Sequence, residues 1–172
     1  RTRKLMKKKV LSEIDLIYGD VSMPSGFEIN RDVLVIDTFV SKHTGKPFEF
    51  SRFWDMLNKY IMDHVRVNYD MELINKNCWG EMYTPLQNSE PLLEIKEVDL
   101  KNSPDYVLLY GVNVKNCSVR IYYDDNRKKG RSWDIPLVNN KFILFPSTCV
   151  YFISNKHEDF LNTIHTITYD KV

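Results

Sequence analysis

The chain of 172 residues and 20.4 kDa has the length of one ordinary domain. Hydrophobic residues make up 43% of it and charged residues 27%, a composition that provides a core and excludes general disorder. The formal net charge is only +1, and the longest apolar runs, such as residues 142–145, are far shorter than the roughly 20 residues of a membrane span. We therefore expect neither a membrane partner nor a secretory segment.

Residues 1–12 are predicted to form a basic arm ahead of a single domain at residues 13–172. The first nine positions hold no acid and six basic residues: Arg1, Arg3, Lys4, Lys7, Lys8 and Lys9. The remainder is net acidic. Such an arm either binds an acidic protein surface or phosphate backbones, or is simply a solvated terminus. Because Met6 precedes three lysines, we also expect a natural start there, with residues 1–5 as an extension or processing remnant.

Two helices are predicted after a turn-rich connector at residues 20–26. Between Val33 and Val40 apolar residues recur at intervals of three and four, and Gly45 with Pro47 supplies a stop. The second helix is predicted from residue 52 to about residue 66. Its apolar residues share one face: Phe53, Leu57, Tyr60, Ile61 and Val65.

From residue 77 onward, short runs rich in β-branched and aromatic residues alternate with Asn, Asp, Gly and Pro, which is typical of strands and turns. Strands are predicted at 78–83, 92–98, 106–114, 118–123, 132–135, 141–145, 150–153 and 164–169. No helical segment separates them, which disfavours a parallel sheet. The predicted fold class is α+β, with N-terminal helices packed on an antiparallel jelly roll, or double-stranded β-helix, of about eight strands. The strand-rich part spans residues 77–172.

The charged segment at residues 124–131 lies between two predicted strands and is typical of a solvated hairpin loop. Its cations also form a candidate contact surface for protein or nucleic acid: Arg127, Lys128, Lys129 and Arg131. The three cysteines are widely spaced, with no C-x-x-C pair, which favours buried thiols in a reducing compartment. The four histidines have no metal-ligand spacing, so no metal or cofactor is expected from them.

Four segments together resemble the double-stranded β-helix of Fe(II)/2-oxoglutarate oxygenases, particularly prolyl-hydroxylase-like members found in phages. These segments are Cys-Trp-Gly-Glu-Met-Tyr at 78–83, Ile-Tyr-Tyr at 121–123, the stretch 130–136, and Lys-Phe-Ile-Leu-Phe-Pro-Ser at 141–147. The resemblance covers about residues 78–170. It implies a jelly roll and, in intact family members, two histidines and a carboxylate for iron and a cation for 2-oxoglutarate.

Aligned on these segments, the family's ligand positions carry other residue types in this chain. The His-x-Asp pair falls on Leu92 and Glu94, the distal histidine on Tyr151, and the oxoglutarate-binding cation near Ile164. A facial-triad iron needs two imidazoles and a carboxylate, and an isoleucine cannot neutralise a dicarboxylate. No histidine lies between His64 and His157. The resemblance therefore implies a degenerate oxygenase fold with no catalytic residues and no cofactor.

Three further segments are Gly-Phe-Glu-Ile-Asn-Arg-Asp at 26–32, the predicted helix containing residues 54–64, and the stretch 122–136. With these segments, the whole chain also resembles proteins of contractile-tailed phages that infect marine cyanobacteria. This resemblance implies a non-enzymatic virion protein of the neck or tail, assembled in the host cytoplasm as an oligomer with other virion proteins. An active oxygenase with atypical ligands, in which His157 or His165 joins Glu94 or an aspartate, is the first alternative. A nucleic-acid-binding module that uses the basic arm and the 127–131 cations is the second.

Overall fold

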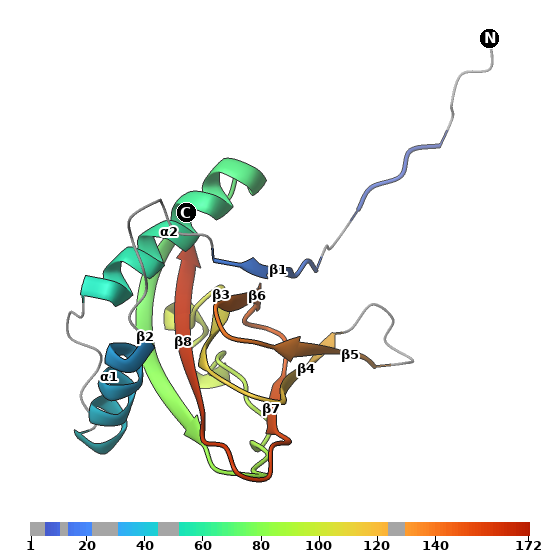
Figure 1. Cartoon of the computed structure of the whole chain (residues 1–172). Coiled ribbons are helices and arrows are strands. Elements are labelled where there is room, and N and C mark those ends of the chain that lie inside the picture. The colour runs from blue at the N-terminus through green and yellow to red at the C-terminus, as the bar shows by residue number, and fades with distance from the viewer. Residues whose placement is uncertain (1–5, 11–13, 22–30, 45–51, 124–129) are drawn as a thin grey trace.

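The computed structural model describes residues 6–10, 14–21, 31–44, 52–123 and 130–172, and within them two antiparallel sheets face each other with two helices on one side (Figure 1). The strands are β1 (Ile17–Asp20), β2 (Leu73–Tyr83), β3 (Tyr106–Asn113), β4 (Cys117–Tyr123), β5 (Arg131–Leu137), β6 (Lys141–Pro146), β7 (Tyr151–Asn155) and β8 (Asn162–Lys171). The helices are α1 (Arg31–Thr44), α2 (Arg52–Tyr69) and a short 3₁₀ helix, η1 (Glu97–Asn102). None of the described helices is long and apolar enough to span a membrane.

The larger sheet has the strand order β1-β6-β3-β8-β2, and the smaller one the order β5-β4-β7. The segment 87–92 runs antiparallel along the outer edge of β7, with backbone bonds from Ser89 to Ile153 (2.8 Å) and between Leu92 and Tyr151 (2.9 and 3.0 Å). This segment therefore continues the smaller sheet beyond β7. Two antiparallel sheets packed face to face form a β-rich sandwich, so the prediction of a jelly-roll type of fold is confirmed at this level.

Strand β8 separates two cores because both of its faces are buried. Ile164 points into the sandwich, among side chains of β3, β4, β6 and β7. Ile167 and Tyr169 point the other way, toward the helices. This burial on both sides explains why β8 lacks a regular alternation of polar and apolar residues in the sequence.

Helix α2 packs on the outer face of the larger sheet through the apolar face that its sequence predicts. Leu57, Ile61 and Val65 are fully buried. The Tyr169 hydroxyl of β8 donates a hydrogen bond to Asn58 Oδ1 at 2.6 Å, which fixes the helix on the sheet. The side chain of Phe53, and the predicted stop at Gly45 and Pro47, lie outside the described residues, while α1 ends at Thr44.

One predicted strand is wrong. Residues 92–98 do not form a strand, since Leu92 makes a single bridge to Tyr151 and the chain then turns into η1 from Glu97. In this antiparallel register, residues after Leu92 would pair with residues before Tyr151, where β7 begins, so they have no strand to pair with. The structure also places β1 at 17–20, where no strand was predicted, because a free edge of β6 receives it.

Candidate functional site

The structure brings together three of the positions that the oxygenase resemblance singled out, here called the triad positions: Leu92, Glu94 and Tyr151. The backbone bridge between Leu92 and Tyr151 sets them side by side. Two residues further on, the Glu94 side chain returns to β7, and its Oε1 accepts a hydrogen bond of 2.7 Å from the Tyr151 hydroxyl. The pairing of residues 87–92 with β7 thus creates this contact, which joins residues 57 positions apart.

Two residues of β2 face the triad positions. Glu81 and Tyr83 are two residues apart on the strand, so they share a face, and both interact electrostatically with the Glu94 carboxylate. Burial, followed by the neighbouring carboxylates, raises the pKa of Tyr83 and that of Tyr151 above the ordinary range. The pKa of Glu81 is raised by burial and by Glu94, against the opposing effect of Lys42. Both phenols therefore stay protonated, and the Tyr151 hydroxyl remains a donor.

Apolar side chains fill the sandwich around this cluster. Ile164, the residue at the expected oxoglutarate-binding position, is fully buried in the same core as Tyr83 and Tyr151. The thiols of Cys117 and Cys149 belong to this core too. Burial raises the pKa of Cys117 to about 12 and also raises that of Cys149, so neither is a thiolate at neutral pH.

The histidines that an atypical oxygenase would need point elsewhere. His165 lies on the helix side of β8, stacked on Trp54 with ring centroids 3.5 Å apart, and burial lowers its pKa to about 3. His157 lies between β7 and β8, where its Nδ1 accepts a hydrogen bond from the Asp159 backbone at 3.0 Å and its ring contacts Phe160. His165 therefore packs with Trp54 in the helix-side core, and His157 lies in the connection between β7 and β8.

The residues at the triad positions do not fit a facial-triad iron. An aliphatic side chain and a protonated phenol stand where the family has imidazoles, and one oxygen of the carboxylate is already an acceptor for that phenol. Among the described residues, no group of three His, Cys, Asp or Glu side chains lies close enough to hold a metal ion. The hydrogen bond between Tyr151 and Glu94 joins two of the three triad positions directly.

An apolar pocket of about 270 Å³ opens beside this cluster, at the end of the sandwich where β1 and β5 lie. Phe145 links the two features, because it lines the pocket and packs edge-on against the Tyr151 ring at 5.1 Å. Leu16, just before β1, lines the pocket and packs against the core of the sandwich. Trp133 lines the pocket and contacts Tyr18 of β1 edge-on, with ring centroids 5.5 Å apart, and both rings remain about half exposed (42% and 52%).

The predicted basic contact residues are not part of this cluster. Lys7, Lys8 and Lys9 are exposed on an extended segment that leads away from the body of the molecule (Figure 1). Arg131 is exposed at the start of β5, opposite Tyr123. The remaining ones, Arg1, Arg3, Lys4, Arg127, Lys128 and Lys129, lie outside the described residues.

Several site residues were not predicted from the sequence. Glu81 and Tyr83 flank the triad positions, and their period-two spacing on β2 was the available signal. Leu16 and Trp133 of the apolar pocket come from segments more than a hundred residues apart. Only the tertiary structure brings these two together.

The two facing antiparallel sheets define a β-rich sandwich of the jelly-roll, or double-stranded β-helix, type. No protein-family model matches the sequence, and a comparison with curated proteins finds no relative. Among solved structures, a prolyl-4-hydroxylase from Pseudomonas putida matches with a TM-score of 0.62 and 12% identity, over 91% of this chain and 88% of that one.

Two further structures extend this comparison. The viral collagen prolyl hydroxylase of Paramecium bursaria Chlorella virus-1, solved with 2-oxoglutarate, has a TM-score of 0.64 and 11% identity, over 91% of this chain and 96% of its own. The Trichoplax adhaerens prolyl hydroxylase, solved with a hypoxia-inducible-factor peptide, has a TM-score of 0.61 and 10% identity, over 90% and 83%. At such identities the likeness shows the fold, which the sequence resemblance had predicted.

Proposed function

We propose that this chain is a non-enzymatic virion protein of a contractile-tailed phage, a neck or tail component that uses an oxygenase-type jelly roll for assembly contacts. The single observation that carries the non-enzymatic part is the 2.7 Å hydrogen bond between Tyr151 and Glu94. The buried phenol donates to the one carboxylate of the triad positions, and this hydrogen bond stabilises the fold. The phenol and Leu92 also occupy the two positions where a facial-triad iron needs imidazoles.

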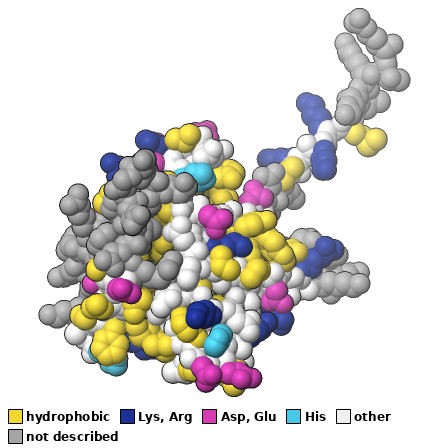
Figure 2. Space-filling model, in the orientation of Figure 1, with side chains coloured by type: hydrophobic (Ala, Val, Ile, Leu, Met, Phe, Trp, Pro, Cys, Tyr) yellow, Lys and Arg dark blue, Asp and Glu magenta, His cyan; other side chains and the backbone are white. Residues whose placement is uncertain are grey.

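The proposed assembly role has support in two surfaces. The extended segment 6–10, with three exposed lysines, stands away from the body and is free to reach a neighbouring subunit (Figure 1). Apolar side chains gather on the part of the surface where β1 and β5 lie (Figure 2). Tyr18 of β1 and Trp133 of β5 are both exposed. Aromatic side chains that surround an apolar pocket are typical of protein contact sites. Jelly rolls also commonly build viral capsids.

The non-enzymatic part is tested by ligand-dependent stability. A ligand that binds only the folded chain raises its melting temperature by mass action. We expect Mn(II) together with 2-oxoglutarate, each at millimolar concentration, to leave the melting temperature of the chain unchanged, with a prolyl hydroxylase of the same fold as the responding control. A rise in melting temperature that Glu94→Ala abolishes would instead identify an active metal site with unusual ligands.

The virion part is tested on particles. Mass spectrometry of purified phage is expected to detect the chain in stoichiometric amounts, and its absence from particles would contradict the proposal. Deletion of residues 1–9 is expected to weaken assembly without changing the melting temperature. An unchanged assembly state would show that the arm has no role. Binding to DNA with an affinity that falls steeply with salt would favour the nucleic-acid alternative.

A further inference from the structure

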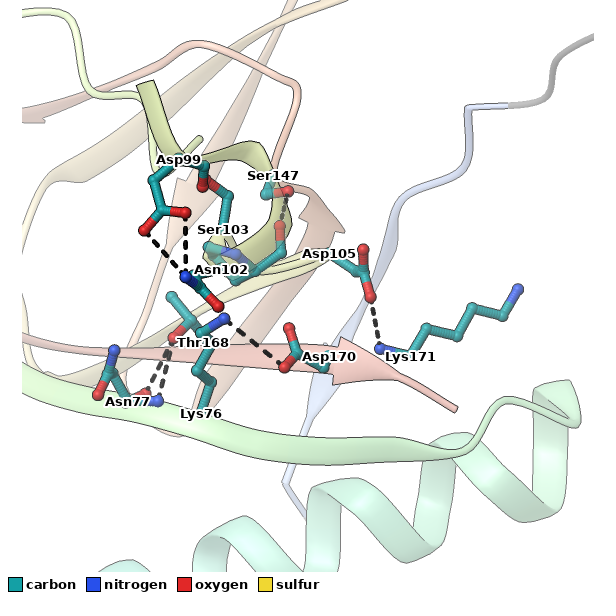
Figure 3. A network of polar contacts seen from close by, with 11 residues as sticks. Lys76, Asn77, Asp99, Asn102, Ser103, Asp105, Ser147, Thr168, Asp170 and Lys171 are labelled. Atoms are coloured by element: carbon teal, nitrogen blue, oxygen red, sulfur yellow. Dashed lines mark hydrogen bonds and ion pairs between the residues drawn. The ribbon is translucent and has the colours of Figure 1, made fainter. Parts of the chain in front are cut away.

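A second cavity, here called the polar groove, is lined by Glu94 and shares no described lining residue with the apolar pocket. It has a volume of about 240 Å³ and lies between strands β2 and β8 and the crossing segment 94–104, which includes η1. Figure 3 shows this segment above the two strands, with its polar side chains pointing down toward theirs. The groove shares Glu94 with the triad positions, whereas Leu92 and Tyr151 are not among its described lining residues, and its floor is formed by Asn77, Trp79 and Thr168.

A β-bulge in β2 shapes the floor. Asn75 pairs with Tyr169 and Asn77 pairs with Thr168, so the backbone of Lys76 is an extra residue that the register with β8 skips. The bulge interrupts the alternation of the strand, and the consecutive side chains of Lys76 and Asn77 both line the groove. Bulges of this kind re-aim side chains at binding sites. A regular strand would have placed only one of these two side chains here.

The roof of the groove is held in place by its own hydrogen bonds. The Ser103 hydroxyl accepts from the Lys96 backbone N–H and donates to the Asp99 carbonyl, both at 2.9 Å. The Asn102 side-chain amide donates to both oxygens of Asp99 at 3.0 and 3.1 Å.

The end of the roof is attached to the sheets as well. The Ser147 hydroxyl donates to the carbonyl of Pro104, and Asp105 accepts from the Lys171 backbone at 2.8 Å (Figure 3). The walls are thus fixed before any ligand arrives, which reduces the entropic cost of binding.

The chemistry of the lining selects a class of ligand. Two cations, Lys76 and Lys96, are balanced by two carboxylates, Glu94 and Asp99, so the groove favours neither anions nor cations. Lys76 is also 3.7 Å from the carboxylate of Asp170, which is not a lining residue, so an anionic ligand would compete with this ion pair for the ammonium group. The lining holds both hydrogen-bond donors and acceptors, and a ligand that matches both carries several hydroxyl groups, each of which donates and accepts.

The size of the polar groove and its aromatic side chain limit which hydroxyl-bearing ligands fit. The volume of about 240 Å³ is below the roughly 300 Å³ at which pockets for drug-sized ligands begin. Among the described residues of the lining, Trp79 is the one aromatic side chain, and its indole offers an apolar ring beside the polar groups. We infer that the polar groove binds a neutral, polyhydroxylated ligand of about one sugar ring, with one face against Trp79 and its hydroxyls bonded to Asn77, Glu94 and Lys96. This inference goes beyond the proposed assembly role and does not depend on it.

The test is saturation-transfer NMR on the full chain, with D-glucose, D-galactose, D-mannose and N-acetyl-D-glucosamine as separate probes. We expect saturation transfer to at least one of them. Asn77→Ala and Lys96→Ala should each weaken that binding by about two- to tenfold, the value of one hydrogen bond. Both residues make their structural hydrogen bonds through the backbone, so truncation of their side chains leaves the groove intact.

Lys101→Ala is the matched control, because Lys101 is exposed on η1 and does not line the groove. It should leave sugar binding unchanged, and the melting temperatures of all three variants should match that of the parent chain. The inference is overturned if none of the four sugars receives saturation, or if Asn77→Ala and Lys96→Ala bind as well as Lys101→Ala. Displacement of the sugar by 2-oxoglutarate at lower concentration than a second sugar would also overturn it, since a charge-balanced groove does not prefer a dianion.

Discussion

Replacement of Tyr151 by phenylalanine removes one hydroxyl from the interior and leaves the ring packing unchanged. The hydroxyl donates to a carboxylate at 2.7 Å, and Tyr151 is only 2% exposed. A hydrogen bond to a charged partner contributes about 1.5–3 kcal/mol to the free energy of unfolding. Because Glu94 is half-buried, beside the polar groove, water can reach part of its carboxylate, and we expect a loss near the lower end of that range. For a domain of this size that loss lowers the melting temperature by about 3–8 °C.

The assay is thermal and urea unfolding at pH 7, followed by circular dichroism. Tyr18→Phe is the matched control, since Tyr18 is 52% exposed and the loss of its hydroxyl should change stability by less than about 0.5 kcal/mol. A double-mutant cycle isolates the contact itself. In a Glu94→Ala background the Tyr151 hydroxyl has lost its acceptor, so Tyr151→Phe should there be neutral or stabilising.

Two results would refute this reasoning. Equal melting temperatures for Tyr151→Phe and Tyr18→Phe would mean that the buried hydroxyl contributes nothing. A cost of Tyr151→Phe that is the same with and without the Glu94 carboxylate would mean that the hydroxyl is stabilised by another partner. Either result would contradict the conclusion that the hydrogen bond from Tyr151 to Glu94 stabilises the fold at the triad positions.

Three further predictions concern the same sheets. Leu92→His combined with Tyr151→His places two imidazoles beside Glu94, and we expect it to gain stabilisation by Mn(II) that the parent chain lacks, measured as a concentration-dependent rise in melting temperature. The raised pKa of Glu81 means that its carboxyl group holds a proton more tightly in the folded chain than in the unfolded chain. Glu81→Gln should therefore raise the melting temperature at pH 7, by a few degrees at most, and the gain should vanish below the unfolded pKa of about 4.3. The pKa of His165 is lowered to about 3, so between about pH 6.5 and 3 its imidazole is protonated in the unfolded chain and neutral in the folded chain. Stability falls with decreasing pH in that window, and His165→Phe should reduce the slope by about 1.4 kcal/mol per pH unit in urea titrations.

The sequence alone determined the elements whose residues interact locally. The apolar face of α2 follows from the spacing of Leu57, Ile61 and Val65, and these three side chains are fully buried. The last strand was predicted at residues 164–169 and lies within β8, since β-branched and aromatic residues favour extended backbone. The sequence also determined that no histidine lies between His64 and His157, which no tertiary arrangement can change.

The tertiary structure decided what depends on pairing between distant strands. The sequence placed a strand at residues 92–98, and the sheet instead pairs residues 87–92 with β7, so that Glu94 meets Tyr151. The bulge at Lys76 and the polar groove beneath η1 likewise depend on the register between β2 and β8. Helical spacing is set within a few residues of the chain, whereas strand register is set by partners tens of residues away, whose positions a single sequence does not specify.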